Sequence, residues 1–396
     1  MVKRIIKYFL SILFTPIYIL ISFVPQKKGL ILFGAWNGKI YSDNPKNIFE
    51  YGLAQDEIKY KLYWVTESFD IYENLTKNKK PVLLKGTFKC AYFQLIADAI
   101  IFTHSTDWEF NSYFIRKKTK RIQTWHGVPL KRIGKDDHRV KENQVISTLK
   151  KILFPYFEER IDLALACGPE DAARYQTAFG IDSKLIKITG YARNDALNRI
   201  SRNSNDAKIK KVIYMPTFRG EPYEECSLTS DYSLDITRLD QSLRAIDVQL
   251  DIKLHPVKPL CTTDKNTINE CTNINLINNT HNLYDTLAVY DALITDFSGV
   301  YVDYMITGRP IILFALDLEG YNRKDRKLYY DINDISVTTP CYTWEDVLIK
   351  LDGLKNDRTN EEKIRYAKVK KMFHKHNDFS SSSRAWCEIK KLINGN

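Results

Sequence analysis

Short motifs that hold nucleotides or metal ions are missing from this sequence. It contains no G-x-x-x-x-G-K-[ST] loop, no G-x-G-x-x-G segment after an expected strand, and no D-x-D pair placed to hold a divalent ion beside a nucleotide. The seven cysteines are scattered without a C-x-x-C pair, which argues against a zinc site or a redox centre. We therefore expect no metal site and no cofactor, and reduced thiols in a protein body that lies in the cytoplasm.

Internal repeats and low-complexity segments are also absent, and the composition is that of a globular chain. Of the 396 residues, 44% are hydrophobic and 27% are charged, so we expect two domains that each bury a core. Lys and Arg number 59 against 48 Asp and Glu, which gives a formal charge of +11. This surplus favours anionic partners, but no nucleic-acid reader motif accompanies it, so nucleic acid is not expected.

The N-terminal segment is the longest uncharged stretch of the chain. It runs from Tyr8 to Pro25, is rich in aromatic residues, and is flanked on both sides by lysines. No small-x-small cleavage pattern follows it, which argues against a signal peptide. Residues 1–28 are expected to anchor the protein to the anionic surface of the cell membrane on its cytoplasmic face, as an interfacial segment or a short span. A buried core helix is the alternative.

The rest of the chain alternates short apolar runs with longer amphipathic stretches. The runs predict twelve strands, at Leu30–Phe33, Tyr60–Val65, Val82–Leu84, Ala99–Thr103, Arg121–Trp125, Asp162–Cys167, Leu185–Thr189, Lys211–Met215, Gln249–Leu254, Ile274–Ile277, Ala292–Thr295 and Ile311–Phe314. Helices are expected between them, for example at Pro45–Gln55, Thr87–Ala97, Pro169–Phe179, Leu283–Tyr290 and Val300–Thr307. Such alternation is typical of α/β domains with parallel sheets.

A polar linker divides this α/β pattern into two halves. Residues 200–210 are rich in Ser, Asn and Asp, and the strand and helix rhythm restarts after them. We therefore expect two Rossmann-like, doubly wound domains at 29–200 and 205–396 that face each other across a cleft. Ligands of such sheets bind at the carboxyl ends of the strands, so functional side chains should directly follow strands.

The first such group is the segment from Gln123 to Lys131, in which His126 and Gly127 follow an expected strand. Glycine permits a tight turn and close approach of a ligand, and a near-neutral imidazole can take a proton from an attacking hydroxyl. Lys131 could hold an anionic acceptor nearby. The alternative for His126 is a packed or surface histidine without a catalytic role.

The second group is Lys253-Leu-His255-Pro256, where proline ends a strand and leaves His255 at its edge. A histidine after a strand in each half is stronger evidence than one alone. His104 also follows an expected strand, however, and shows that this position by itself is weak evidence. The remaining histidines lie in polar segments and are expected at the surface, namely His138, His281, His374 and His376.

Two further groups suit a phosphate. Thr217 and Arg219 follow the first strand of the second half, and a guanidinium with a neighbouring hydroxyl matches phosphate oxygens. In the segment from Leu293 to Tyr304, Thr295 ends a strand, Ser298 lies where a helix is expected to begin, and Asp303 follows within that helix. A helix N-terminus binds anions, and Asp303 could reach a ribose or diol hydroxyl. A surface ion pair for Arg219 and plain helix capping by Ser298 are the alternatives.

Taken in order, these segments resemble the CDP-glycerol glycerophosphotransferase family, the teichoic acid primases and polymerases. The matching segments are Gln123–Lys131, Gly190–Asp195, Tyr214–Arg219, Leu254–Pro256 and Ile294–Tyr304, followed by Arg309-Pro310. The resemblance implies a GT-B arrangement, with an acceptor domain at 29–200 and a CDP-donor-binding domain at 205–396. It further implies that His126 is the general base, that His255 contacts the donor phosphates, and that Ser298 and Asp303 bind the donor.

The expected reaction is transfer of glycerol phosphate from CDP-glycerol to a lipid-linked or polymeric acceptor of teichoic acid or capsule-type polymer synthesis, with release of CMP. The sequence departs from the family pattern at Ala192, where proline is usual, and at Gly299, where a second serine is usual. Because one hydroxyl is lost, CDP-ribitol or another CDP-polyol remains an alternative donor. A nucleotide-sugar glycosyltransferase or epimerase of the same fold, and a non-catalytic polyanion binder, are further alternatives.

Overall fold

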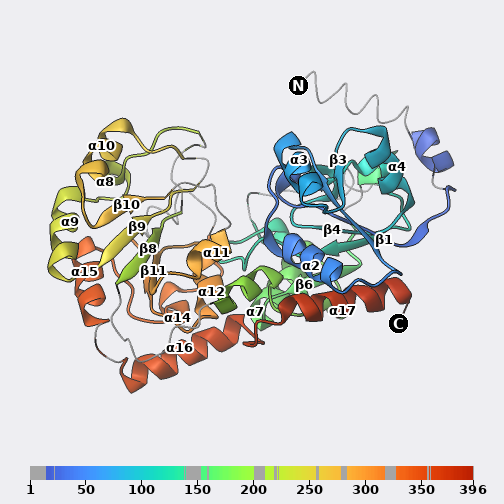
Figure 1. The fold of residues 1–396 in the computed structure, drawn as a ribbon. Coiled ribbons are helices and arrows are strands. Elements are labelled where there is room, and N and C mark those ends of the chain that lie inside the picture. Colours follow the sequence, from blue (N-terminus) through green and yellow to red (C-terminus); the bar gives the residue numbers. More distant parts are fainter. Residues whose placement is uncertain are drawn as a thin grey trace. The chain divides into compact units, whose positions relative to one another are not determined.

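The computed structural model describes residues 15–21, 23–137, 139, 153–157, 160–199, 210–217, 221, 223–255, 258–277, 283–316, 327–354, 356 and 358–395. The chain forms two compact units. Unit 1 comprises Met1–His126, Gly134–Asp195 and Ser380–Asn396, and unit 2 comprises Gly127–Ile133 and Ala196–Phe379. Both units are built on a parallel sheet covered by helices (Figure 1).

The sheet of unit 1 has seven parallel strands in the order β3-β2-β1-β4-β5-β6-β7. The strands are β1 (Lys27–Phe33), β2 (Lys61–Thr66), β3 (Val82–Leu84), β4 (Ala97–Phe102), β5 (Lys120–Gln123), β6 (Leu163–Ala166) and β7 (Ile186–Ile188). Strand order reverses between β1 and β4, and such a switch point is where doubly wound sheets bind ligands.

Alternate residues of β1 face the two layers of helices in unit 1. Ile31 and Phe33 pack in one core with Trp386 and residues of α2, whereas Leu30 and Leu32 pack in another core with residues of α4. The helices of this unit are α2 (Asp43–Ala54), α3 (Phe69–Lys77), α4 (Phe88–Ile96), α5 (Thr106–Glu109), α7 (Pro169–Phe179) and α17 (Ser381–Asn394). Short 3-10 turns lie at Trp36–Gly38, Ser112–Phe114, Gly134–Asp136, Pro155–Phe157 and Ser183–Leu185, and a longer one spans Ala192–Arg199.

The sheet of unit 2 has five parallel strands in the order β10-β9-β8-β11-β12. The strands are β8 (Lys211–Met215), β9 (Gln249–Ile252), β10 (Ile274–Leu276), β11 (Ala292–Thr295) and β12 (Ile311–Leu313). The helices are α8 (Leu228–Asp231), α9 (Ile236–Ala245), α10 (Thr262–Glu270), α11 (Leu283–Leu287), α12 (Val300–Met305), α14 (Ile332–Ile335), α15 (Trp344–Gly353) and α16 (Asn360–Phe373). All twelve predicted strands are thus confirmed, with ends that differ by a few residues.

The units do not follow the continuous ranges that the sequence predicted. α17 returns to unit 1, because Trp386 packs edge-on against Tyr60 with ring centroids 5.4 Å apart and Asp195 accepts hydrogen bonds from the backbone at the start of α17. Residues 127–133 belong to unit 2, where an antiparallel bridge joins Lys131 to Leu328. Composition marks linkers but not such returns of the chain, so the sequence did not reveal them.

Most of the expected membrane segment lies outside the described residues, which begin at residue 15 and omit residue 22. Residues 15–21 are helical. Tyr18 in this helix is buried and its hydroxyl donates to the carbonyl oxygen of Ile115 at 3.0 Å. In the part of the chain that the structure describes, no helix is both long enough and apolar enough to cross a membrane.

Candidate active site

His126 follows β5, where the backbone leaves the sheet of unit 1. Trp125 has a φ of 53° and Gly127 has a φ of 138°. The N–H of Trp125 donates to Oε1 of Gln123 at 3.0 Å, and its carbonyl oxygen accepts from Nδ2 of Asn44 at 3.3 Å. A left-handed backbone costs a non-glycine residue about 1–3 kcal/mol. These hydrogen bonds hold the bend that places the imidazole beyond the carboxyl end of the sheet.

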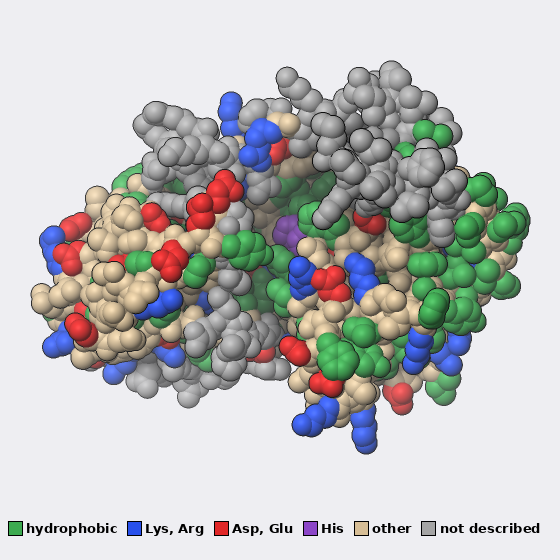
Figure 2. All heavy atoms as spheres, turned by 90° about the horizontal axis from the view of Figure 1, so that it is seen from above, with side chains coloured by type: hydrophobic (Ala, Val, Ile, Leu, Met, Phe, Trp, Pro, Cys, Tyr) green, Lys and Arg blue, Asp and Glu red, His purple; other side chains and the backbone are tan. Residues whose placement is uncertain are grey.

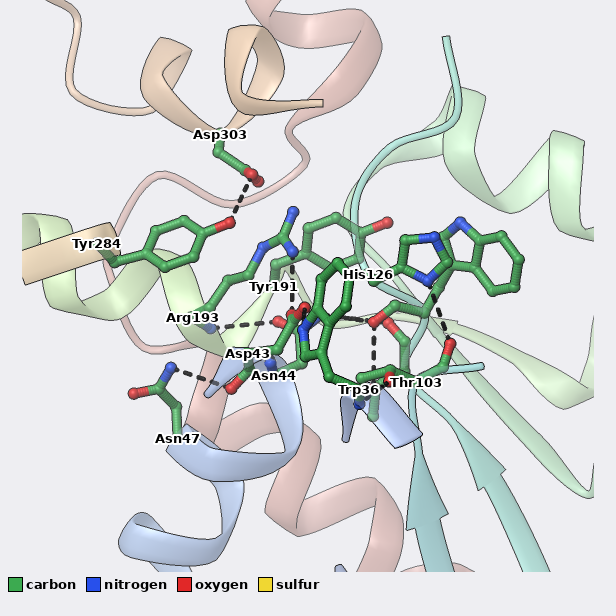
Figure 3. A network of polar contacts seen from close by, with 12 residues as sticks. Trp36, Asp43, Asn44, Asn47, Thr103, His126, Tyr191, Arg193, Tyr284 and Asp303 are labelled. Carbon is green, nitrogen blue, oxygen red and sulfur yellow. Dashed lines mark hydrogen bonds and ion pairs between the residues drawn. The ribbon is translucent and has the colours of Figure 1, made fainter. Parts of the chain in front are cut away.

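The imidazole of His126 lies parallel to that of His104, with ring centroids 4.1 Å apart and an angle of 9° between the planes. Its Nδ1 lies 3.4 Å from the carbonyl oxygen of Thr103 (Figure 3), so we assign the proton to Nδ1 and the lone pair to Nε2. Burial, and then the neighbouring His104, lower the pKa of His126 to about 3. At neutral pH the ring is therefore neutral and has a lone pair that can accept a proton.

His104 lies against the fully buried carboxylate of Glu109, the last residue of α5. Nδ1 of His104 is 3.2 Å from Oε1 of Glu109 and 2.8 Å from the hydroxyl oxygen of Thr103. Glu109 also accepts from the Thr103 hydroxyl at 2.8 Å and from the backbone N–H groups of His104 and Ser105 at 3.1 Å each. A carboxylate at Nδ1 fixes the ring orientation and the tautomer of a histidine, and leaves Nε2 as the acceptor.

A buried ion pair supports the loop that contains His126 (Figure 3). Nη1 of Arg193 lies 2.9 Å from Oδ1 of Asp43, and the two side chains are 4% and 2% exposed. Oδ2 of Asp43 accepts from Nε1 of Trp36 at 3.0 Å. Asn44 accepts from the backbone N–H of Arg193 at 3.2 Å and donates to the carbonyl oxygen of Thr124 at 3.2 Å. Two segments that are distant in sequence, at residues 36–44 and at Arg193, are thereby tied to the end of β5.

The motif at residues 190–195 is a structural support of unit 1. Besides the ion pair of Arg193, the hydroxyl of Tyr191 donates to Oδ2 of Asp171 at 2.7 Å inside the core. The carboxylate of Asp195 accepts from the backbone N–H groups of Ser381 and Ser382 at 2.9 and 2.7 Å. The motif therefore joins the sheet, the loop at His126 and α17.

His255 follows β9 in unit 2 and lies in a cationic environment. Burial, then Lys253 and then Lys131 lower its pKa. Burial alone lowers the pKa of Lys253, which is 8% exposed. Protonation of the imidazole is disfavoured beside the two lysines, and an anion that binds among these groups would stabilise them.

Residues 127–133 bring Lys131 into this cluster. The antiparallel bridge between Lys131 and Leu328 is flanked by a hydrogen bond of 2.8 Å from the N–H of Arg132 to the carbonyl oxygen of Lys327. The structure thus places Lys131 in unit 2 with the second histidine, although only four residues separate it from the first. Gly127, which begins this segment, is the residue at which the chain passes between the units.

Thr217 and Thr295 join the ends of two neighbouring strands, β8 and β11. The N–H and the hydroxyl of Thr217 donate to the carboxylate of Asp296 at 2.9 and 2.6 Å. Thr295 is fully buried and donates to the carbonyl oxygen of Met215 at 2.6 Å. Both hydroxyls therefore have partners within the protein. The predicted phosphate ligand Arg219 lies outside the described residues.

Ser298 precedes Gly299, the N-cap of α12, and Asp303 lies in the first turn of this helix. The hydroxyl oxygen of Ser298 accepts from the N–H of Val300 at 3.4 Å. Asp303 is 1% exposed and accepts from the hydroxyl of Tyr284 at 2.8 Å (Figure 3). The structure thus gathers Gly127, Lys131, Thr217, Thr295, Ser298, Asp303 and His255 in unit 2 and leaves His126 in unit 1.

Sequence reasoning missed several of these neighbours. His104 was cited only to show that a histidine after a strand is weak evidence, yet its ring stacks on that of His126. Arg193 and Lys253 lie inside the quoted motifs, but no role was assigned to either. Glu109 and Asp43 give no signal in the sequence, because a buried carboxylate is recognised only from the partners around it.

Among the residues that the structure describes, no group of three or more His, Cys, Asp or Glu side chains could hold a metal ion.

The prediction that His374 lies at the surface was wrong, because it is 3% exposed and its Nε2 lies 2.7 Å from the carbonyl oxygen of Val302. His138 and His281 lie outside the described residues.

Comparisons with known proteins agree with this architecture. The sequence model described as CDP-Glycerol:Poly(glycerophosphate) glycerophosphotransferase matches residues 17–391. A teichoic acid glycerol-phosphate transferase of Staphylococcus aureus is 30% identical over 379 residues, which cover 92% of this chain and 93% of that protein. A teichoic acid poly(glycerol phosphate) polymerase of Bacillus spizizenii is 26% identical over 381 residues, covering 91% and 92%.

Solved structures show the same fold. The wall teichoic acid polymerase TagF, in a histidine variant soaked with CDPG, superposes with a TM-score of 0.74 at 21% identity, covering 100% of this chain and 97% of that one. The predicted α/β fold with parallel sheets is thereby confirmed. Because the sequence model matches nearly the whole chain, this protein belongs to the CDP-glycerol:poly(glycerophosphate) glycerophosphotransferase family.

Proposed function

We propose that this enzyme transfers glycerol phosphate from CDP-glycerol to a lipid-linked or polymeric acceptor in teichoic acid or capsule-type polymer synthesis, and releases CMP. Family membership supports the reaction class, and one structural observation supports the chemistry. The chain has the neutral imidazole of His126, stacked on His104, at the end of one sheet and a cationic cluster at the end of the other. Phosphotransfer needs both kinds of group, a proton acceptor and cations that stabilise phosphate charge.

In this proposal unit 2 binds the donor. His255, Lys253 and Lys131 contact the phosphates of CDP-glycerol, and the end of β11 with Ser298 lies on the same unit. Preorganised cations lower the barrier because they stabilise charge that develops on the phosphate oxygens. Thr217 acts through Asp296, which joins the ends of β8 and β11, and Asp303 acts through Tyr284, which joins α12 to α11.

Unit 1 receives the proton in the same proposal. The acceptor hydroxyl attacks the phosphorus that bears glycerol, the bond from that phosphorus to CMP breaks, and the hydroxyl proton passes to Nε2 of His126. The ring of His104 stacks on that of His126 and helps to hold it in position. Glu109 in turn fixes the orientation of the His104 ring through its contact with Nδ1.

We also propose that unit 1 contacts the cytoplasmic face of the cell membrane. Tyr18 and Ile21 face inward from the helix at 15–21, whereas Ile17, Leu20 and Phe23 are exposed. Figure 2 shows hydrophobic side chains gathered at the right-hand end of the view, where unit 1 lies. Exposed apolar side chains on an N-terminal helix suit insertion among lipid headgroups.

CDP-ribitol is the nearest alternative donor, since Gly299 replaces the second serine of the family pattern. Incubation of purified protein with CDP-glycerol, CDP-ribitol or UDP-N-acetylglucosamine and a lipid-linked acceptor distinguishes these functions. We expect CMP release and acceptor labelling with CDP-glycerol. CMP release with CDP-ribitol alone would reassign the donor, release of UDP with transfer of the sugar would indicate a glycosyltransferase, and conversion of UDP-N-acetylglucosamine to its epimer would indicate an epimerase. Absence of turnover with every donor, together with retained polyanion binding, would leave the non-catalytic alternative.

A further inference from the structure

Arg116 is a buried cation with an unoccupied hydrogen-bonding edge. In the sequence it lies between the 3-10 turn at Ser112–Phe114 and β5, and it is 2% exposed. Nη1 donates to the carbonyl oxygen of Val24. Among the described residues, Nε and Nη2 have no hydrogen-bond partner. These two nitrogens form one fork of the guanidinium, the geometry that matches two oxygens of a phosphate or a carboxylate.

A cavity of about 270 Å³ lies beside this guanidinium, lined by Phe23, Val24, Pro25, Gln26, Arg116 and Lys118. Lys118 adds a second cation, and none of these lining residues is acidic. Gln26 is held in place because Nε2 donates to the carbonyl oxygen of Ala97 at 3.1 Å. A buried charge without a full set of partners is costly, so the cavity should be most stable with an anion in it.

The rim of this cavity is apolar and exposed. Phe23, which is one of the lining residues, is 79% exposed, and Leu20 in the preceding helix is 70% exposed. A free phosphate ion would gain nothing from these side chains, whereas the acyl chains of a lipid would cover them. The cavity therefore suits an amphiphile with an anionic head.

We propose that the Arg116 cavity binds the phosphate of an anionic phospholipid headgroup, with Lys118 as a second contact and Phe23 against the acyl chains. This site is separate from the active site, and the proposal rests on the membrane contact described above. Such a site would make the membrane contact of unit 1 prefer anionic lipids, in addition to the apolar contacts of its exposed side chains. A bidentate, charge-assisted pair at Arg116 should account for roughly tenfold or more in affinity.

Sedimentation of the full-length protein with phosphatidylcholine vesicles, with and without phosphatidylglycerol, tests the site. Wild-type protein should prefer the anionic vesicles. Arg116→Met should lose about tenfold or more of that preference, and Lys118→Ala about fivefold. Lys117→Ala is the matched control, because it removes the same charge next to the cavity without removing a lining residue. Equal losses for Lys117→Ala and Lys118→Ala, or unchanged binding by folded Arg116→Met, would overturn the proposal.

Thermal unfolding separates the lipid from a free ion. A short-chain soluble phosphatidylglycerol should raise the Tm of wild-type protein and leave that of Arg116→Met unchanged, because only the folded site binds it. An equal rise with inorganic phosphate would show that the site holds a free ion and contradict the lipid assignment. If Arg116→Met does not fold, a larger loss of anionic-vesicle preference in Lys118→Ala than in Lys117→Ala supports the site, and equal losses overturn it. CMP release with a water-soluble acceptor should be unchanged in Arg116→Met, so failure of this proposal is distinguishable from failure of the proposed function.

Discussion

The two units end their central strands in opposite electrostatic environments. In unit 1 the imidazoles of His126 and His104 stack, and the nearby charges are matched, as in the buried pair of Asp43 and Arg193. In unit 2 burial, and then the two lysines around it, lower the pKa of His255. A neutral site can accept a proton and a cationic site can hold phosphates. In our proposal, two sheets of the same type therefore take on separate chemical roles through the few residues that follow their strands.

The largest effect should come from breaking the ion pair that supports unit 1. Arg193→Ala leaves Asp43 buried without its cation, which should cost about 3–5 kcal/mol of unfolding free energy. Chemical denaturation measures it. Arg174→Ala is the control, because its ion pair with Glu170 is partly exposed and should contribute about 1 kcal/mol or less. Equal losses for the two variants would show that the buried pair has no special role.

Acid should destabilise both units through a histidine that stays neutral when folded. Burial lowers the pKa of His126 to about 3 and that of His374 to about 4, below the ordinary value of 6.5. As pH falls below 6.5, these histidines become protonated in the unfolded chain but stay neutral in the folded chain. Each histidine should therefore lower the unfolding free energy by about 1.4 kcal/mol per pH unit until its folded pKa is reached.

Unfolding free energies measured between pH 7 and pH 4.5 test this dependence. His126→Gln and His374→Gln should each reduce the slope. A slope that stays the same in either variant would show that the histidine concerned titrates normally in the folded protein.

A smaller effect should distinguish the cationic cluster of unit 2. Lys253→Ala should weaken CDP-glycerol binding about tenfold, since one charge-assisted contact to phosphate contributes about 1.5 kcal/mol, and added salt should shrink the difference. Calorimetry measures the affinity. Lys265→Ala removes an exposed lysine of α10 in the same unit and should have almost no effect. Matching losses in both variants would indicate only a general charge effect.

The smallest effect concerns the departure at Gly299. A Cβ there would lie 3.6 Å from its nearest neighbour, the carbonyl oxygen of Val128, and the residue is the N-cap of α12. Gly299→Ser should therefore fold and gain a few tenths of a kcal/mol of stability. If the missing hydroxyl tunes the donor, the ratio of turnover with CDP-glycerol to that with CDP-ribitol should also change. Destabilisation by this serine would contradict the geometry at α12.

Strands were easier to predict than sites. β3, β8 and β11 lie where the apolar runs predicted, because buried parallel strands leave short apolar runs with polar ends. His126 and His255 could be proposed from their positions after strands. The pairing of His104 with Glu109, and that of Arg193 with Asp43, could not, because packing between distant segments creates them.

The return of α17 to unit 1 could not be predicted from the sequence either. Its cause is the burial of one tryptophan, Trp386, and the capping of the helix by a distant carboxylate, Asp195. Neither contact can be recognised from the local composition of the sequence. Likewise, the bridge at Lys131 moves a residue from the expected acceptor side to the cluster at His255.

The central claim is that unit 1 accepts the proton and unit 2 holds the donor phosphates, and a paired measurement on His126→Ala and His255→Ala tests it most directly. CMP release and CDP-glycerol affinity are measured on both variants across a pH series, with circular dichroism to establish folding. We predict that His126→Ala loses about 10² to 10⁴ in turnover, keeps its donor affinity and recovers partly at high pH. His255→Ala should lose turnover and donor affinity without recovery at high pH. Wild-type turnover in folded His126→Ala protein would contradict the account.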